Sequence, residues 1–256
     1  MRIDQLLVQQ GLAASRSQAQ RLIAAGVSWR LPVPAGNPWR AVRKSGDDVP
    51  AFAELMLADD SESRYVSRGG LKLAGALAHC GLDVRGRVCL DVGQSTGGFT
   101  DCLLQAGAAR VVGVDVGHGQ LHARIAADPR VTALEGINAR AIRRADLGDA
   151  LPAGGFDLVV VDVSFISLTK VLPALAALCA PQAHLIALVK PQFEVGPGGL
   201  DRHGIVRDAA RYDAVRTTVT DCAAACGWQV HAWLDSPITG GDGNREFFIH
   251  ATLRAA

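Results

Sequence analysis

The sequence contains no long hydrophobic run and almost no net charge. Its apolar runs, such as residues 158–161, are far shorter than the roughly 20 residues that cross a bilayer, and no charged-then-apolar leader precedes Ile3. Lysine and arginine number 26 against 25 aspartates and glutamates, which leaves a formal charge of +1. We therefore expect no membrane span and a cytoplasmic location. The near-zero net charge gives no overall electrostatic field that would indicate a nucleic acid as partner.

Cysteine is present, but without the spacing of a disulfide framework or a metal site. The six cysteines include no Cys-x-x-Cys. Cys222 and Cys226 stand four residues apart on an expected helix. A buried apolar pair is favoured there over a metal pair, because no nearby histidine or acid completes a tetrahedral set. We expect free thiols, a reducing compartment and no bound metal.

The glycine-rich stretch at residues 88–100 carries the strongest local signal. Its first half has the apolar residues of a buried parallel strand, and its second half has three glycines, at positions 93, 97 and 98. The pattern predicts a strand to Asp91, a turn that exposes backbone N–H groups, and a helix to Gln105. Ligands bind beyond the carboxyl ends of such strands. An ordinary tight turn that binds no nucleotide is the alternative.

Asp115 ends the next expected strand, where an acid accepts hydrogen bonds from the ribose of a nucleoside held by the turn. The turn lacks the Gly-x-Gly-x-x-Gly of dinucleotide enzymes and the Gly-Lys-Ser/Thr of phosphate loops. An adenosine cofactor without phosphates, such as S-adenosylmethionine, is therefore favoured. Asn138, after the third strand, is either an adenine contact or a turn residue that satisfies its own backbone.

From Arg87 onward, strands and helices alternate, which predicts an α/β fold with a parallel sheet covered by helices on both faces. The two closing strands are joined by a short glycine-rich link and are expected to form an antiparallel hairpin at the sheet edge. Before Arg87, a helix from about Gly70 is expected to bury Leu71, Ala74, Leu77 and Ala78, with Lys72 off that face. Strands are expected at 88–91, 110–115, 131–134, 156–162, 183–190, 229–234 and 246–253, and helices at 99–105, 121–126, 168–179 and 209–226.

The N-terminal segment is locally basic. Through Pro50, seven lysines and arginines stand against three acids, a local charge of +4. Apolar spacing predicts a helix ended by Gly11, and a capping box of Ser15 with Gln18 predicts a second helix ended by Gly26. The prolines and tryptophans that follow favour short edge strands and turns.

Up to Gly26, this segment resembles the small RNA-binding domain found in ribosomal protein S-four and in pseudouridine synthases. The resemblance rests on Arg2-Ile-Asp-x-Leu-Leu and on Ser15-Arg-Ser-Gln-Ala-x-x-Leu-Ile-x-x-Gly26, and the sequence after Gly26 diverges from that family. Arg16 and Arg21 then become RNA contacts, with a solvated helix face as the alternative. We expect an RNA-binding domain at 1–58, a linker at 59–66 around a polar break, and a second domain at 67–256.

Charged residues follow two of the expected strands. Asp162 and Lys190 each come directly after an apolar run, so both side chains should emerge at the carboxyl edge of the sheet beside the cofactor. Lys72 and Glu246 are less distinctive by themselves, because a lysine on a helix and a glutamate on an edge strand are usually solvated.

The motifs together resemble the TlyA (haemolysin A) family of FtsJ-like ribosomal RNA 2′-O-methyltransferases across nearly the whole chain. They are Ser67-Arg-Gly-Gly-Leu-Lys, Leu90-Asp-Val-Gly-x-Ser-Thr-Gly-Gly-Phe-Thr-Asp, Gly113-Val-Asp-Val-Gly-x-Gly-Gln-Leu, Asp162-Val-Ser-Phe-Ile-Ser-Leu, Lys190-Pro-Gln-Phe-Glu and Gly243-Asn-Arg-Glu-Phe. The resemblance implies a class I (Rossmann-like) fold, S-adenosylmethionine as cofactor, and ribosomal RNA or ribosomal subunits as partner. Gln94 departs from it, since a small residue is usual there.

The resemblance also implies site residues. A catalytic Lys-Asp-Lys-Glu tetrad maps onto Lys72, Asp162, Lys190 and Glu246. The candidate cofactor contacts are Asp91, Gly93, Ser95, Thr96, Gly97, Gly98, Phe99, Asp115, Val116 and Asn138. The candidate RNA contacts are Arg2, Arg16, Arg21, Arg64 and Arg68.

The tetrad suits methyl transfer to a ribose hydroxyl, which must lose its proton as it attacks. We expect Lys190 to act as the base and Asp162 to orient it, although coupling between the two lysines leaves the assignment between them open. The motif after strand 156–162 is neither the Asn/Asp-Pro-Pro-aromatic of amine methyltransferases nor a cysteine nucleophile. An RNA-binding pseudoenzyme of the same fold and a membrane-active haemolysin are the remaining alternatives.

Overall fold

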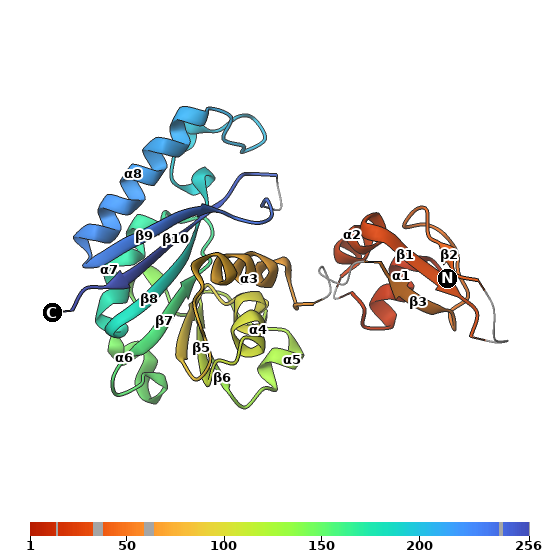
Figure 1. The fold of residues 1–256 in the computed structure, drawn as a ribbon, viewed down its shortest axis with the longest axis horizontal. Coiled ribbons are helices and arrows are strands. Elements are labelled where there is room, and N and C mark those ends of the chain that lie inside the picture. The colour runs from red at the N-terminus through yellow and green to blue at the C-terminus, as the bar shows by residue number, and fades with distance from the viewer. Residues whose placement is uncertain (14, 33–37, 59–63, 241–242, 256) are drawn as a thin grey trace. The chain divides into compact units, whose positions relative to one another are not determined.

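The structure, a computed structural model, describes residues 1–13, 15–32, 38–58, 64–240 and 243–255. It divides into two units, Met1–Leu71 and Lys72–Ala256, each with a hydrophobic core of its own (Figure 1). The polar break at residues 59–63, where we expect a linker, lies outside the described residues.

The first unit packs two helices against a small antiparallel sheet. The helices are α1 (Ile3–Gln9) and α2 (Arg16–Gly26), and the strands are β1 (Val27–Arg30), β2 (Arg40–Ala41) and β3 (Glu54–Leu57), in the order β2-β1-β3. The Ser15 side chain accepts a hydrogen bond from Gln18 N, which confirms the predicted start of α2. Apolar residues of both helices pack with Val27 of β1, so the segment after Gly26 does form strands despite its divergent sequence.

The second unit contains a sheet of seven strands in the order β6-β5-β4-β7-β8-β10-β9. The first five are parallel, and β10 is antiparallel to both of its neighbours, as the predicted hairpin requires. The strands are β4 (Val88–Val92), β5 (Arg110–Asp115), β6 (Val131–Glu135), β7 (Phe156–Val161), β8 (Cys179–Val189), β9 (Trp228–Asp235) and β10 (Phe247–Leu253). The helices are α3 (Arg68–Cys80), α4 (Gly98–Gln105), α5 (Ala123–Ala126), α6 (Arg144–Leu147), α7 (Leu172–Leu175) and α8 (Ala209–Ala225).

Helices cover both faces of this sheet. Figure 1 shows α3, α4 and α5 on one side and α7 and α8 on the other. The strands are apolar on both faces for this reason: one face packs against α7 and α8, and on the other Phe99 of α4 stacks on Phe248 of β10 at 6.2 Å. The arrangement leaves the carboxyl edge of the parallel strands for polar residues.

Two sequence predictions for the helices were wrong in detail. On α3, Leu77 is buried as predicted, but the fully buried positions are Leu73 and Ala76. Leu71 and Ala74 are only partly buried, Ala78 is exposed, and Lys72 is buried. The expected single helix over 168–179 is broken into two 3-10 turns around α7, whose first turn contains Pro173. Apolar spacing alone did not reveal either feature, because tertiary packing decides which face of a short helix is covered.

Candidate active site

The glycine turn after β4 is shaped by close backbone contact. Gly93 has a φ of +85°, and a Cβ at this position would lie 2.3 Å from the carbonyl oxygen of Asp162. Any side chain would therefore push the first turn away from the segment that follows β7. Gly97, with a φ of +91°, comes directly before α4 and packs against the side chains of Leu121 and Ile125.

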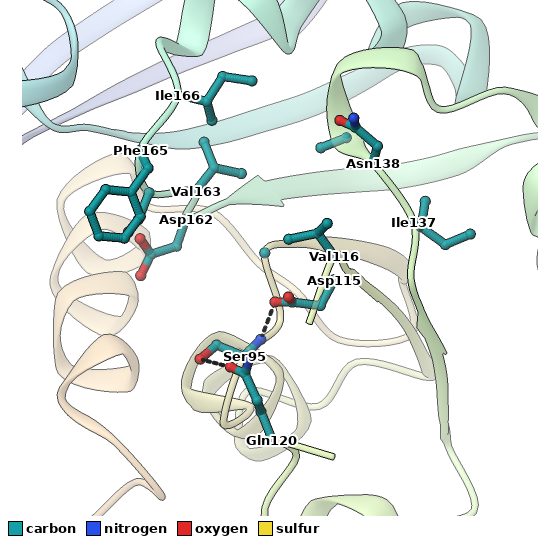
Figure 2. A pocket seen from close by; sticks show the side chains of 13 residues that line it. Ser95, Asp115, Val116, Gln120, Ile137, Asn138, Asp162, Val163, Phe165 and Ile166 are labelled. Atoms are coloured by element: carbon teal, nitrogen blue, oxygen red, sulfur yellow. Dashed lines mark hydrogen bonds between the residues drawn. The ribbon is translucent and has the colours of Figure 1, made fainter. Parts of the chain in front are cut away.

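A cavity of about 470 Å³ opens at the carboxyl edge of the sheet, within the size range of small-molecule sites. Figure 2 shows its walls: the segment after β7 on one side, and the ends of β5 and β6 opposite. Its lining is Gly93, Ser95, Asp115, Val116, Gln120, Ile137, Asn138, Ala139, Asp162, Val163, Ser164, Phe165 and Ile166. Apolar side chains thus face a few polar groups, as in a site for a nucleoside.

Asp115 is the polar centre of one wall. Its Oδ2 accepts a hydrogen bond from Ser95 N at 2.7 Å, and its Oδ1 accepts one from Gly117 N at 2.7 Å (Figure 2). Each carboxylate oxygen has two acceptor positions, so both can still receive a ribose hydroxyl. The Ser95 hydroxyl, from the glycine turn, donates to Gln120 Oε1 at 3.1 Å.

The other predicted cofactor residues divide into two groups. Val116 and Asn138 line the cavity with Gly93, Ser95 and Asp115. Asn138 also satisfies its turn, because its Oδ1 accepts a hydrogen bond from Arg140 N at 3.0 Å, which leaves the amide nitrogen for a ligand. The residues outside this lining are Asp91, Thr96, Gly97, Gly98 and Phe99. Phe99 is 3 % exposed and belongs to the core, and Gly97 and Gly98 join the turn to α4.

Asp91, at the end of β4, is fully buried with an unusual environment. Its Oδ2 accepts a hydrogen bond from the Thr100 hydroxyl at 2.6 Å, while no described group donates to its Oδ1. Burial raises the pKa of the Asp91 carboxyl to about 7, and the charges of Asp162 and Asp115 add to the rise. A buried carboxyl of this kind favours a positively charged ligand group nearby.

Gln94 does not enter the cavity. Its side chain is 5 % exposed, donates to Thr100 Oγ1 at 2.9 Å and fills the space above Gly113, where a Cβ would overlap it at 1.9 Å. The larger residue is therefore accommodated between β4 and β5, and the cavity wall is formed by Gly93 and Ser95 on either side of it.

The four tetrad residues form two ion pairs. Lys72 Nζ of α3 lies 2.5 Å from Glu246 Oε2, with 10 % and 3 % of the side chains exposed. Lys190 Nζ lies 2.6 Å from Asp162 Oδ1, with 11 % and 23 % exposed. Lysine is rarely buried unless it is paired. The low exposure of both lysines therefore depends on their carboxylate partners.

The strand register explains how these pairs meet. Phe247 of β10 pairs with Val189 of β8, so Glu246 and Lys190 are the next residues beyond that pairing. Gly240 leaves space for the glutamate, because a Cβ there would lie 2.7 Å from Glu246 Oε1. Asp162 follows β7, the parallel neighbour of β8. The tetrad therefore comes from adjacent strand ends and from α3.

Three further residues at this edge escaped the sequence reasoning. Ser164 Oγ accepts a hydrogen bond from Lys190 Nζ at 2.8 Å, and Phe165 is 91 % exposed with a φ of +64°. Glu194 accepts hydrogen bonds from Ser167 Oγ at 2.5 Å and from Leu168 N at 2.7 Å, and burial raises the pKa of its carboxyl. All three lie inside the motifs that follow β7 and β8. The signal that could have revealed them in the sequence is Phe165, an aromatic residue in a short polar segment.

The candidate RNA contacts lie in the first unit. Arg2 is engaged by the buried Asp4 through two hydrogen bonds, at 3.0 and 2.9 Å, and so also has a structural role. Arg16 is exposed and Arg21 half-buried on α2. The Arg64 guanidinium lies over the Tyr65 ring at 5.2 Å, and Arg68 begins α3.

Across the described ranges, no cluster of three or more histidine, cysteine, aspartate or glutamate side chains could hold a metal ion. Among the helices built from those residues, none is long and apolar enough to cross a membrane.

The sheet order, the glycine turn and the cavity at the carboxyl edge define a class I, Rossmann-like methyltransferase fold. A solved S-adenosylmethionine-dependent methyltransferase from Mesorhizobium loti has this fold, with a TM-score of 0.52 at 16 % identity over 70 % of this chain and 96 % of that one. The chain belongs to the FtsJ-like methyltransferase family, whose model matches residues 65–253, and the S4 domain model matches residues 1–26.

Two relatives match over nearly the whole chain. A Mycobacterium tuberculosis protein named 16S/23S rRNA (cytidine-2′-O)-methyltransferase TlyA is 45 % identical over 97 % of this chain and 88 % of its own length. The solved structure of a candidate hemolysin from Streptococcus thermophilus is 41 % identical, with a TM-score of 0.74 over 99 % of this chain and 88 % of that one.

Proposed function

We propose that the protein transfers a methyl group from S-adenosylmethionine to a ribose 2′-hydroxyl of ribosomal RNA. The observation that carries the proposal is the juxtaposition of two lysine–carboxylate pairs with a nucleoside-sized cavity at one sheet edge. The Mycobacterium tuberculosis relative, named for this reaction on ribosomal RNA, supports the substrate class.

The residues fit the cofactor. Asp115 offers acceptors for ribose hydroxyls, and Asn138 offers an amide beside apolar Val116 and Ile137 for a base. The buried carboxyl of Asp91 lies outside the cavity lining, so it favours the positive charge of an amino acid ammonium group through its field and not through a contact. When bound, S-adenosylmethionine supplies an electrophilic methyl group on a positively charged sulfur.

The chain's own residues then handle the hydroxyl proton and its geometry. A ribose hydroxyl is a poor nucleophile until its proton is removed, and Lys190 is the base for that proton. Asp162 lines the cavity and forms an ion pair with the Lys190 amine at 2.6 Å, which keeps the amine at this edge of the sheet. Lys72 and Glu246 form the second ion pair of the tetrad. Alignment of the hydroxyl with the methyl group supplies much of the rate.

Phe165 offers a surface for the base of the target nucleotide. Its ring is 91 % exposed beside Asp162 (Figure 2). The centroid of the Phe193 ring lies 5.2 Å from that of Phe165, at a tilt of 47°. Exposed aromatic rings of this kind stack with unpaired bases. A nucleotide held there would bring its ribose toward the Lys190–Asp162 pair.

In this proposal the N-terminal segment, residues 1–58, is the RNA-docking module. A linker at 59–66 and the methyltransferase domain at 67–256 follow it. The candidate RNA contacts of this module are Arg2, Arg16 and Arg21. Two more candidates lie beyond it: Arg64 in the linker and Arg68 at the start of the methyltransferase domain. The S4 domain match supports this role.

The test is the variant Lys190→Ala, with Lys170→Ala as a matched control because Lys170 is an exposed lysine of the same domain. Methyl transfer to ribosomal RNA should fall by at least about 100-fold in Lys190→Ala, the lower bound for losing a general base, while calorimetry should find cofactor binding nearly unchanged. Full activity in Lys190→Ala would overturn the mechanism. Wild-type protein that binds RNA and cofactor but methylates nothing would instead identify a pseudoenzyme.

A further inference from the structure

Ser164 lies between the cavity and the base. It is the second residue after Asp162 in the segment that follows β7, it is exposed, and it lines the cavity. Its hydroxyl oxygen accepts a hydrogen bond from Lys190 Nζ at 2.8 Å. The cavity side of the hydroxyl is therefore open to a substrate, while the other side is in contact with the lysine.

Lys190 itself does not line the cavity; Asp162 and Ser164 do. Its side chain is 11 % exposed. Asp162 Oδ1 is 2.6 Å from the amine, but this contact does not have hydrogen-bond geometry, whereas the contact of Lys190 Nζ with Ser164 Oγ at 2.8 Å does. The hydrogen-bonded route from the cavity to the amine thus passes through a hydroxyl.

The backbone around Ser164 is held in a costly conformation. Phe165 has a φ of +64°, a region that a bulky residue rarely enters because of its steric cost. Glu194 fixes the end of the same segment through its hydrogen bonds with Ser167 and Leu168 N. Strain of this kind persists only where the surroundings impose it, and here it lets Ser164 contact Lys190 while the Phe165 ring remains in solvent.

We propose that Ser164 is a catalytic residue that relays the ribose 2′-hydroxyl proton to Lys190. The inference rests on the proposed function. The ribose oxygen forms a bond to the methyl carbon as the bond between that carbon and sulfur breaks, and the electron pair of that bond stays on sulfur. The ribose proton passes to Ser164 Oγ, and the proton of Ser164 passes to the neutral amine of Lys190, which becomes an ammonium. Lys190 then returns a proton to water.

The chemistry of the neighbouring groups favours serine for this step. A hydroxyl both accepts and donates a hydrogen bond, so it can take one proton while it gives another. The Asp162 carboxylate can only accept a hydrogen bond, and it balances the ammonium that forms on Lys190. The two residues have different tasks: Ser164 transmits the proton, and Asp162 stabilises its destination.

The first experiment compares Ser164→Ala, which removes the hydroxyl, with Ser164→Thr, which keeps it. Thr217→Ala is the control, because it removes an exposed hydroxyl that contacts only its own helix. With cofactor and RNA saturating, single-turnover methyl transfer should fall about 100-fold in Ser164→Ala, the lower range for a lost proton-transfer group. It should stay within about tenfold of wild type in Ser164→Thr and be unchanged in Thr217→Ala.

A proton inventory in mixtures of H₂O and D₂O separates a relay from a positioning role. A relay predicts a curved inventory for wild type, because two protons move together, and a straight one for Ser164→Ala. A slow Ser164→Ala enzyme that keeps the wild-type curve would overturn the relay and leave the serine a positioning residue. Ser164→Ala at the full wild-type rate would also overturn it.

A readout independent of turnover is the acylation of Lys190, followed by mass spectrometry on the full chain without RNA. Loss of the Ser164 hydrogen bond should change the Lys190 labelling rate at least threefold in Ser164→Ala and leave it unchanged in Thr217→Ala. Unchanged labelling in Ser164→Ala would show that the contact is absent in solution and would refute the relay. If Lys190→Ala is inactive while Ser164→Ala is fully active, only the relay is refuted. If Lys190→Ala is active, the proposed base is refuted as well.

Discussion

The buried pair of Lys72 and Glu246 allows a sharp prediction about stability. Lys72→Met keeps the length of the side chain but removes its charge, which leaves a glutamate that is 3 % exposed without its partner at 2.5 Å. Removing one member of a buried ion pair costs about 3–5 kcal/mol, because the remaining charge is desolvated and uncompensated. The double variant Lys72→Met/Glu246→Leu should return to within about 1–2 kcal/mol of wild type, since apolar residues replace such pairs at little cost.

At pH 7, a cost of about 3–5 kcal/mol corresponds to a melting point of Lys72→Met lowered by roughly 6–20 °C.

The assay is urea unfolding of wild type, both single variants and the double variant at pH 7. Methyl transfer is measured in parallel and should be lost in all three variants, so that stability and activity separate in the double variant. The buried ion pair would be refuted if Lys72→Met lowered the free energy of unfolding by less than about 1 kcal/mol at pH 7. It would also be refuted if the double variant were no more stable than the less stable single variant.

Three further outcomes are expected. Phe165→Ala should raise KM for RNA roughly 5- to 150-fold, the value of one lost base stack, with cofactor affinity unchanged; an unchanged KM would contradict stacking. Burial and His184 lower the pKa of His250 to about 4, so its stabilising contribution is complete above pH 6.5 and is lost as the pH falls toward 4. Because the ring is about half exposed, we expect a loss of about 1 kcal/mol, which pH-dependent urea unfolding of His250→Gln should not show. Replacing Arg16 and Arg21 by glutamine should reduce the slope of log affinity against log salt by about 2, and an unchanged slope in a filter-binding assay would exclude them as phosphate contacts.

Local signals in the sequence predicted most of the fold. The start of α2 at the Ser15 cap, the strands beside the glycine turn and the antiparallel edge hairpin were all confirmed. These features depend on residues that are near in sequence: a capping side chain, a run of apolar residues, or a link too short for a crossover. The break in the 168–179 segment was missed because its apolar pattern is equally compatible with one continuous helix.

At the site, residues that directly follow strands could be anticipated. Asp115 and Asp162 line the cavity because the carboxyl ends of parallel strands share one edge. Gln94 could be singled out by its size, but only the structure showed that Gly113 makes room for it. Ser164 and Glu194 were not anticipated, because their importance depends on partners from a different strand end.

The sequence alone determined the order of strands and helices, the glycine turn and the class of the protein, since periodicity, caps and motif spacing are encoded along the chain. Only the tertiary structure decided that Lys72 is buried and paired with Glu246, 174 positions away. It also decided that the Lys190 amine is hydrogen-bonded to Ser164 and only ion-paired with Asp162. The physical reason is that a side chain's charge environment depends on which distant element covers it, and burial is a property of the packed molecule.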